Sequence, residues 1–257
     1  MKVYYVNSAV HQEQDVVAAF EKVKNLVRGD RNIKTITFLV GQQNQFNMLA
    51  PLNFTSRQIA NQGFATSDGY HIQFKTLRNY HPDYVFSGHM PSEILVPICI
   101  PPQNLYQFED YSNIAYWVIV PWTIAENESF LSIHEAEDCA MGTLHTAPMA
   151  LDGRVANAVD WLKDTSYPNE GYHHPNDENR LKNMAVKLKK MRISIDYDAV
   201  VYYCYNHGFI PSAARKTADY FVRAQSHPMR ISDPYSNLES IINAPREQHI
   251  ITSQYDR

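Results

Sequence analysis

Mostly polar residues follow three of the apolar runs that have the composition of buried strands. They are Asn7, Ser8 and His11 after the first run, Gly41, Gln42 and Asn44 after the second, and Trp122, Thr123 and Glu126 after the last. Ligands of open parallel sheets bind beyond the carboxyl ends of the strands, so we expect these residues to line one ligand-binding site. Most are neutral, which suits a sugar, a nucleobase or a nucleotide better than a bare anion. Strand-end loops are polar in most proteins, and each residue alone is equally well explained as ordinary surface.

Glu126 is the carboxylate of this set and our candidate catalytic residue. It follows the last expected strand, residues 116–120, by six positions. A carboxylate there would serve as a nucleophile, a general base or a ligand of ribose hydroxyls. It would equally serve as the cap of the next helix, so enzyme activity stays open.

Two denser clusters carry groups capable of metal or thiol chemistry. His173, His174 and Asp177 contain metal-ligating types, but a capped helix start explains the run from His174 to Asp177 more simply, and we predict no metal. The second cluster contains the parts of a Cys–His pair, in an acidic stretch that would raise the thiol pKa. Its members are His134, Glu135, Glu137, Asp138, Cys139 and His145. An acidic linker between domains is the better interpretation.

The fingerprints of common enzymes on α/β sheets are missing. No G-x-G-x-x-G follows the first strand, and neither G-x-x-x-x-G-K-[ST] nor G-x-S-x-G occurs. Dinucleotide, P-loop and serine-hydrolase chemistry are therefore disfavoured, and the sequence identifies no cofactor.

Alternating strand and helix patterns occupy residues 1–130. Strands are expected at 3–6, 36–40, 71–77, 94–100 and 116–120, with a helix over 16–27 and short helices near 56–61 and 105–111. Short connections between such elements imply parallel pairing, so we predict a Rossmann-like, doubly wound, mainly parallel five-stranded sheet. Pro97 cannot donate to a central ladder, so the fourth strand should begin after it, or lie at an edge or bulge.

Beyond a linker at 131–150, residues 151–228 show helical spacing only and predict a small helical module, followed by a tail at 229–257. Helices are expected around the apolar stripe from Val155 to Leu162, from a cap at Asn176 or Asp177, from Asp196 to Gly208, and from Ser212 or a neighbour to His227. The last two are joined by a short glycine-containing turn, which is compatible with helix-turn-helix. A contiguous basic surface on this module would be formed by Arg180, Lys187, Lys190, Arg215 and Arg223.

Charge is spread unevenly along the chain. The whole sequence has 23 Lys and Arg against 27 Asp and Glu, a net charge of −4, which argues against wholesale nucleic-acid binding. Residues 1–153 hold 9 basic against 15 acidic residues (−6), whereas 154–225 hold 11 against 8 (+3). A second module is indicated, and a nucleic-acid partner for it is disfavoured but not excluded.

Cysteine usage and hydropathy predict a cytoplasmic protein. The three cysteines are widely spaced and odd in number, which supports no disulfide framework. No apolar run approaches the roughly 18 residues of a membrane helix, and the first residues lack a signal-peptide core, so no membrane partner is expected. Leu238, Ile241 and Ile242 of the tail would dock on the body or on a second subunit, so a homo-oligomer stays open.

Several short segments together resemble a family of uncharacterised bacterial proteins. They are residues 116–123, His174-Pro175, Asp196 to Val200, and His207-Gly208-Phe209, and the likeness covers most of residues 1–225. The resemblance implies a Rossmann-like N-terminal domain and a C-terminal helical module, and no catalytic residue.

Two functions are compatible with these observations. The first is binding, or processing, of a small polar ligand (a nucleotide, nucleoside or sugar) at the carboxyl edge of the sheet. The alternative is a non-enzymatic interaction protein whose basic helical module binds protein or nucleic acid.

Overall fold

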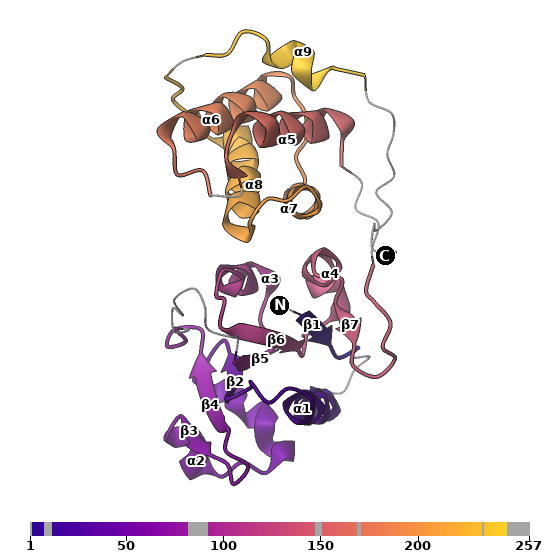
Figure 1. Cartoon of the computed structure of the whole chain (residues 1–257), viewed down its shortest axis with the longest axis vertical. Helices are drawn as coiled ribbons and strands as arrows, with labels where there is room; N and C mark the ends of the chain where they lie inside the picture. The colour runs from indigo at the N-terminus through magenta and orange to yellow at the C-terminus, as the bar shows by residue number, and fades with distance from the viewer. Residues whose placement is uncertain are drawn as a thin grey trace. The chain divides into compact units, whose positions relative to one another are not determined.

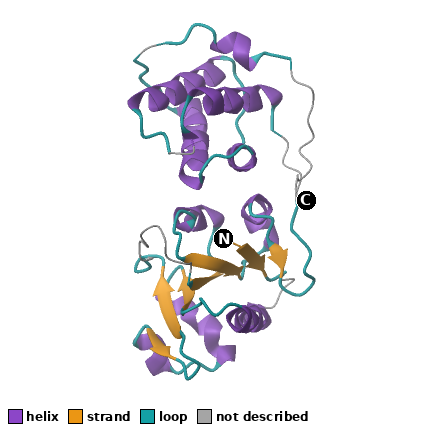
Figure 2. Cartoon of the chain, in the orientation of Figure 1, coloured by secondary structure: helices purple, strands orange, loops and turns teal. Residues whose placement is uncertain are grey.

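The computed structural model describes residues 2–7, 12–81, 92–146, 151–168, 171–232 and 234–245. The chain divides into two compact units, Met1–Ala147 and Pro148–Arg257 (Figure 1). Every strand of the described residues lies in the first unit, and the second is helical (Figure 2). Over the described ranges, no helix has the length and apolar character needed to cross a membrane.

The first unit is an α/β fold around a mixed, mostly parallel sheet of seven described strands in the order β3-β4-β2-β5-β6-β1-β7. The strands are β1 (Lys2–Tyr5), β2 (Thr35–Val40), β3 (Gly63–Ala65), β4 (His71–Thr76), β5 (Glu93–Ile98), β6 (Ile114–Ile119) and β7 (Glu137–Asp138). Only β3, paired with β4, is antiparallel among these pairings. The predicted strand number of five is wrong, because the edge strands β3 and β7 have three and two residues and leave no apolar run.

Helices lie on both sides of this sheet. The helix α1 (Gln12–Gly29) and the 3-10 helix η1 (Gln43–Leu52) pack together, whereas α3 (Pro102–Leu105) packs with α4 (Ile124–Ile133). Figure 1 shows α1 on one side of the sheet and both α3 and α4 on the other. Two shorter helices, α2 (Ser56–Ala60) and η2 (Tyr106–Phe108), complete the unit. Covering both faces explains why the central strands are continuous apolar runs, since each face must be shielded from water.

Phenylalanines fill the core on the α1 side of β2 and β4. This aromatic cluster consists of Phe20, Phe38, Phe46, Phe54, Phe64 and Phe74. Phe74 lies at its centre, 5.1 Å from the ring of Phe54 and 5.9 Å from the ring of Phe38. Tilted and offset rings at these distances add to the stabilisation from burial alone.

Pro97 lies inside β5, in the middle of the sheet, and pairs in register with Leu39 of β2. Its carbonyl oxygen accepts a hydrogen bond from Val120 N at 2.9 Å, so its nitrogen, which has no hydrogen, also faces β6. Pairing with β6 accordingly runs from Glu93 to Leu95 and resumes only at the bridge of Ile98. The expected strand start or edge position is therefore wrong, because an interrupted ladder on one side accommodates the proline.

Residues 131–146, the described part of the segment expected as a linker (131–150), contribute structure to the first unit. They hold the last turn of α4 and the strand β7, which pairs in parallel with β1. Asp138 stabilises the turn after β7, because its Oδ1 accepts hydrogen bonds from the N–H groups of Ala140 and Met141 at 2.8 and 2.9 Å. The acidic composition of this stretch therefore reflects turn formation and ion pairing.

The second unit contains the four predicted helices: α5 (Gly153–Thr165), α6 (Pro175–Lys190), α7 (Tyr197–Asn206) and α8 (Pro211–Ser226). Asp196 begins α7 as predicted, with its side chain accepting a hydrogen bond from Ala199 N at 3.1 Å. The cap of α6 is His174 rather than Asn176 or Asp177, and Ile210 precedes α8 without a side-chain cap. Both α6 and α8 begin with proline, which has no N–H group to satisfy. The first turn therefore needs one hydrogen-bond acceptor fewer than an ordinary helix start.

The described part of the tail docks on its own unit. Helix α9 (Leu238–Ile242) packs against α5 and α6, and both Leu238 and Ile242 are buried. Asn157 of α5 donates from Nδ2 to the carbonyl oxygens of Ile242 and Ala244, each at 3.0 Å. Of the two docking alternatives, the body is therefore the one observed.

Replacing Phe74 by alanine should destabilise the first unit by about 3–5 kcal/mol, because a fully packed ring leaves a cavity. The matched variant Phe64→Ala, at the half-buried edge of the aromatic cluster, should cost less than half as much. Native-state amide exchange in β2 measures both free energies. Equal losses would contradict the placement of Phe74 at the centre.

Candidate functional site

The strand-end residues lie at one edge of the sheet, as the parallel pairing requires. Gly41 and Gln42 follow β2, Trp122 and Thr123 follow β6, and Asn7 follows β1. Most are exposed, including Asn44 in η1, Glu126 in the first turn of α4, and Trp122, which keeps 52% of its surface accessible. Ser8 and His11 fall outside the described residues.

Neighbouring strands β1 and β6 send the chain to opposite faces of the sheet. The chain after β1 enters α1, the chain after β6 enters α4, and these helices lie on opposite sides (Figure 1). Such a divergence opens a crevice beyond the strand ends, which is where ligands bind in open α/β sheets. The end of β1 is therefore an expected position for a ligand-binding site.

A pocket of about 540 Å³ lies beside the end of β1, between α1 and the turn after β7, and its lining includes no described residue of β6 or α4. Its lining residues are Val6, Asn7, Gln14, Asp15, Ala18, Glu21, Lys22, Asn25, Asp138, Cys139, Ala140 and Met141. Asn7 is the described member of the predicted set that lines it. The other described members, at the ends of β2 and β6 and in η1 and α4, do not.

Asp15 is the pocket residue with a buried polar atom that lacks a hydrogen-bond partner. Only 8% of its surface is exposed, and its Oδ2 atom has no hydrogen-bond partner within the described part of the chain. A buried polar atom without a partner costs about 1–3 kcal/mol, and more when it is charged. Asp15 Oδ2 is therefore an unsatisfied acceptor that is closed to solvent beneath the pocket.

Cys99, directly after β5, is hydrogen-bonded to the end of β6 and is not among the residues that line the pocket. It follows β5 in a left-handed backbone conformation (φ 52°), and its N–H donates to Val120 O at 2.8 Å. Burial, and to a smaller extent the charges of Asp15 and Glu126, raise the pKa of the Cys99 thiol to about 11. The thiol is thus protonated at neutral pH.

Thr123 and Glu126 form the start of α4. The Thr123 hydroxyl accepts a hydrogen bond from Glu126 N at 3.2 Å, so Thr123 caps the helix and the Glu126 side chain does not. Behind them, Asn127 is buried and donates to Thr123 O at 3.3 Å, while its Oδ1 has no described partner. The Glu126 carboxylate remains exposed on this edge.

Gly41 and Gln42 form the turn that leads into η1. The N–H of Gln42 donates to Gln45 Oε1 at 2.7 Å, and this oxygen lies 2.9 Å from the position of a Cβ on Gly41. A side chain at Gly41 would therefore collide with Gln45. The local geometry accounts for both residues without a ligand.

The sequence elements of a Cys–His pair are not assembled into one. Burial raises the pKa of Cys139 to about 12, so its thiol is a poor nucleophile. His134 Nε2 lies 2.6 Å from Glu109 Oε1, and His145 packs edge-on against the Tyr5 ring at 5.5 Å. These histidines link elements of the fold.

The cluster of His173, His174 and Asp177 also has a structural explanation. His174 Nδ1 accepts a hydrogen bond from Asn176 N at 3.2 Å, and buried Asp177 accepts one from Arg180 at 2.8 Å. Over the described ranges, no three His, Cys, Asp or Glu side chains are placed to hold a metal ion.

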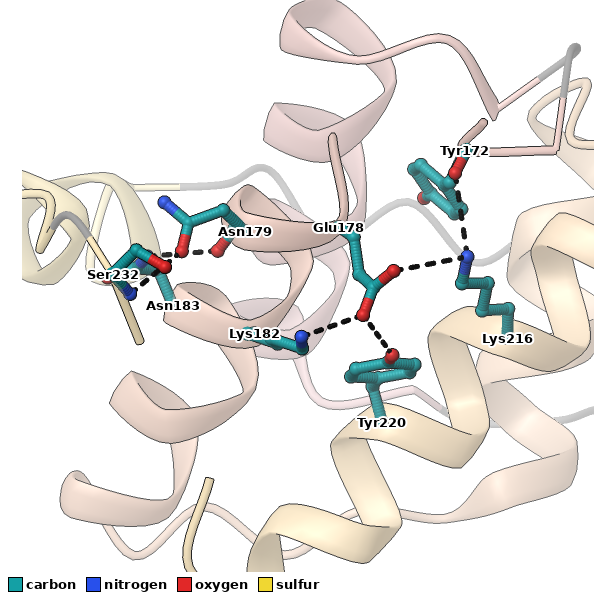
Figure 3. A network of polar contacts seen from close by, with 8 residues as sticks. All are labelled: Tyr172, Glu178, Asn179, Lys182, Asn183, Lys216, Tyr220 and Ser232. Carbon is teal, nitrogen blue, oxygen red and sulfur yellow. Dashed lines mark hydrogen bonds and ion pairs between the residues drawn. The ribbon is translucent and has the colours of Figure 1, made fainter. Parts of the chain in front are cut away.

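Several basic side chains of the second unit contact carboxylates. Lys182 and Lys216 converge on Glu178, at 2.7 and 4.0 Å, and Tyr220 donates to the same carboxylate at 2.8 Å (Figure 3). The Lys182 ammonium, first of these partners, holds the pKa of Glu178 below its usual value. Arg180 pairs with Asp177, and Lys187 with Glu239. The basic surface expected from the sequence is thus partly neutralised.

Asp15 and Cys99 are the site residues that sequence reasoning missed. Cys99 stood inside the expected strand 94–100, although Pro101-Pro102 directly beyond it signals an earlier strand end. Asp15 precedes the apolar helix stripe at Val16, where an acidic residue is ordinarily explained by the helix dipole.

No protein-family model matches the chain, and neither a curated protein nor a solved structure is similar to it. The function must therefore be inferred from the residues of the pocket and the strand ends.

Acid should weaken the β7 side of the pocket through Glu137. Lys2, at 2.8 Å, and Lys22, at 3.2 Å, lower its pKa from the ordinary value of 4.5. A lowered folded-state pKa stabilises above the unfolded-state value and loses that contribution as the pH falls through the folded value. Wild type should therefore exceed Glu137→Gln in unfolding free energy by up to about 1 kcal/mol at neutral pH, and by nothing once the pH is well below the lowered folded-state pKa of Glu137.

Urea unfolding of both proteins across this pH range measures the difference. The variant Glu13→Gln, at an exposed position in the first turn of α1, controls for the loss of one carboxylate. A difference between wild type and Glu137→Gln that persists in acid would contradict the role of the ion pairs.

Proposed function

We propose that the first unit is a Rossmann-like, doubly wound domain that binds a small polar ligand in the pocket beside α1. The nucleoside and sugar classes fit this pocket best. The observation that carries the proposal is a pocket of about 540 Å³ beside the end of β1, with Asn7, Asp15 and Asp138 in its lining. That volume is within the range of about 300–1,000 Å³ typical of small-molecule sites.

The strand order supports the doubly wound arrangement. From β1 the chain passes β6 and β5 to reach β2, and from β5 it runs the opposite way through β6 to β7. The first connection uses α1 and the second uses α3 and α4, on the other side of the sheet. Two windings in opposite directions are the defining feature of this class of folds.

The lining charges favour hydroxyl-rich ligands over phosphates. Asp15, Glu21 and Asp138 contribute carboxylates, and the lining lysine, Lys22, is already engaged. Its Nζ lies 3.2 Å from Glu137 and 3.8 Å from the centroid of the Tyr4 ring. A phosphate would meet repulsion here, whereas hydroxyl groups would donate to the carboxylates. Nucleosides and sugars are therefore better suited than nucleotides.

Glu126 is the group that would act on such a ligand as a general base or nucleophile. Its carboxylate is exposed at the sheet edge, and both it and Asp15 influence the Cys99 thiol. A ligand anchored at Asp15 and extending along the edge would approach it. Binding and catalysis are then separable, since different helices supply the two carboxylates.

The alternative, an interaction protein acting through its helical module, has less support. Arg180, Lys182, Lys187 and Lys216 contact carboxylates of the same unit. Nucleic-acid phosphates would have to compete with these ion pairs. The alternative predicts salt-sensitive binding of the full chain to duplex DNA.

A thermal-shift screen against nucleosides, sugars and nucleotides tests the proposal. A ligand at about 100 times its Kd should raise the Tm by roughly 5–10 °C. The variant Asp15→Ala should weaken binding at least about tenfold, because the pocket lining loses one of its carboxylates. The double variant Thr123→Ala, Glu126→Ala should leave binding at Asp15 within a few-fold and abolish any turnover.

Asp68→Ala is the matched control, because it removes an equal charge from an exposed turn between β3 and β4. It should bind as wild type does. A flat response to all three ligand classes would overturn the proposal, as would unchanged affinity in Asp15→Ala.

A further inference from the structure

We infer that the segment from Ser232 to Ala244 is an exchangeable strap, and that the face of α5 and α6 beneath it receives the same segment from a second copy of this chain. The partner is thus an identical chain, and reciprocal exchange of the two straps forms a dimer. Residue 233 of the strap lies outside the described residues. The ligand proposed for the first unit plays no part in this exchange.

Amide side chains of α5 and α6 hold the backbone of the strap near both of its ends. Asn179 Oδ1 accepts a hydrogen bond from Ser232 N at 3.2 Å (Figure 3), and Asn183 Oδ1, one helical turn further on, accepts one from Tyr235 N at 3.4 Å. Asn157 donates to two backbone carbonyl groups at the other end, each at 3.0 Å. Because these bonds use backbone groups, a strap of the same course from another chain would form them equally well.

Three side chains of α9 make the fit specific. Leu238 and Ile242 are buried where α9 packs against α5 and α6, and Glu239 forms an ion pair with Lys187 of α6. Apolar residues four positions apart lie on one side of a helix, so both enter the same face. A second copy of this chain carries the same three residues. Its strap would therefore repeat the fit that the structure already shows within one chain.

The strap is held less firmly than the helices beneath it. Of its described residues, only Leu238 and Ile242 are buried, and α9 has five residues and no side-chain cap. Ordering the backbone costs entropy at every residue, whereas only buried side chains contribute the hydrophobic gain. Segments with few buried contacts open locally while the rest of a domain stays folded. The strap should therefore detach more readily than any of the four helices α5 to α8.

Residues 227–231 form the hinge for this movement. Helix α8 ends at Ser226, and the first hydrogen bond from the strap to α6 is made by Ser232. Within the described part of the chain, no backbone hydrogen bond involves residues 228–231. Exchange would change the course of this hinge and re-form every strap contact between two chains. Such swapping is a low-cost route to a dimer, because it needs no new interface.

Opposite charge reversals in one ion pair test the inference on the full chain. Lys187→Glu and Glu239→Lys each place like charges between the strap and the face of the same molecule. In a mixture of the two proteins, exchanged straps bring opposite charges together at both faces of a heterodimer. Heterodimers should therefore exceed random pairing by about tenfold or more. Native mass spectrometry with one isotope-labelled partner measures this ratio.

Lys190→Glu is the matched control, because it reverses an equal charge at an exposed position of α6. Its mixture with Glu239→Lys should pair at random, since a heterodimer then gains one favourable contact and keeps one unfavourable contact. The double variant Lys187→Glu, Glu239→Lys restores opposite charges within one chain and should dimerise as wild type does.

Sedimentation of wild type measures the dimer itself. Its fraction should rise with concentration from about 10 µM to about 1 mM, the order of effective concentration that a short linker imposes on a tethered segment. A chain that stays monomeric throughout this range would overturn the inference. Dimers that pair at random in the mixture of Lys187→Glu with Glu239→Lys would also overturn it, because they would form through another surface.

Discussion

Parallel pairing of buried strands is the constraint on which the candidate site depends. Because β2, β5, β6 and β1 run in the same direction, their carboxyl ends meet at one edge, and the helices that follow must leave by one face or the other. The sheet keeps this pairing even through Pro97, at the cost of an interrupted ladder toward β6. Both faces are covered by helices, so the open edge at the strand ends is where polar side chains from distant segments come together.

Ion pairing then decides which of these polar groups are free to act. On β7, Glu137 binds Lys2 and Lys22, which fixes the wall of the pocket and occupies its lysine. In the second unit, Glu178 occupies Lys182 and Lys216 in the same manner. Charge counts along the sequence treat these residues as acidic or basic surface. The contacts show that each of them is paired with an opposite charge in the fold.

Sequence patterns predicted the elements with long, regular apolar spacing. The central strands, α1, and the four helices of the second unit were predicted from such runs, and the polar strand ends followed from parallel pairing. The edge strands β3 and β7 were not predicted, because two or three residues define no period and depend on pairing with β4 and β1. Asp15 and Cys99 were not predicted, for a related reason. The burial of both residues and the missing partner of Asp15 Oδ2 are properties of the assembled sheet edge.

Asp15 also shows why a carboxylate without a partner can persist in the folded chain. It lies in the first turn of α1, where the helix dipole stabilises a negative charge by about 0.3–1 kcal/mol. An unsatisfied buried acceptor costs about 1–3 kcal/mol, and more when charged, so the dipole offsets only part of the cost. The remainder is small enough for a folded unit with a large core to tolerate. Asp15 is therefore a locally destabilising residue that the packing of the surrounding core compensates.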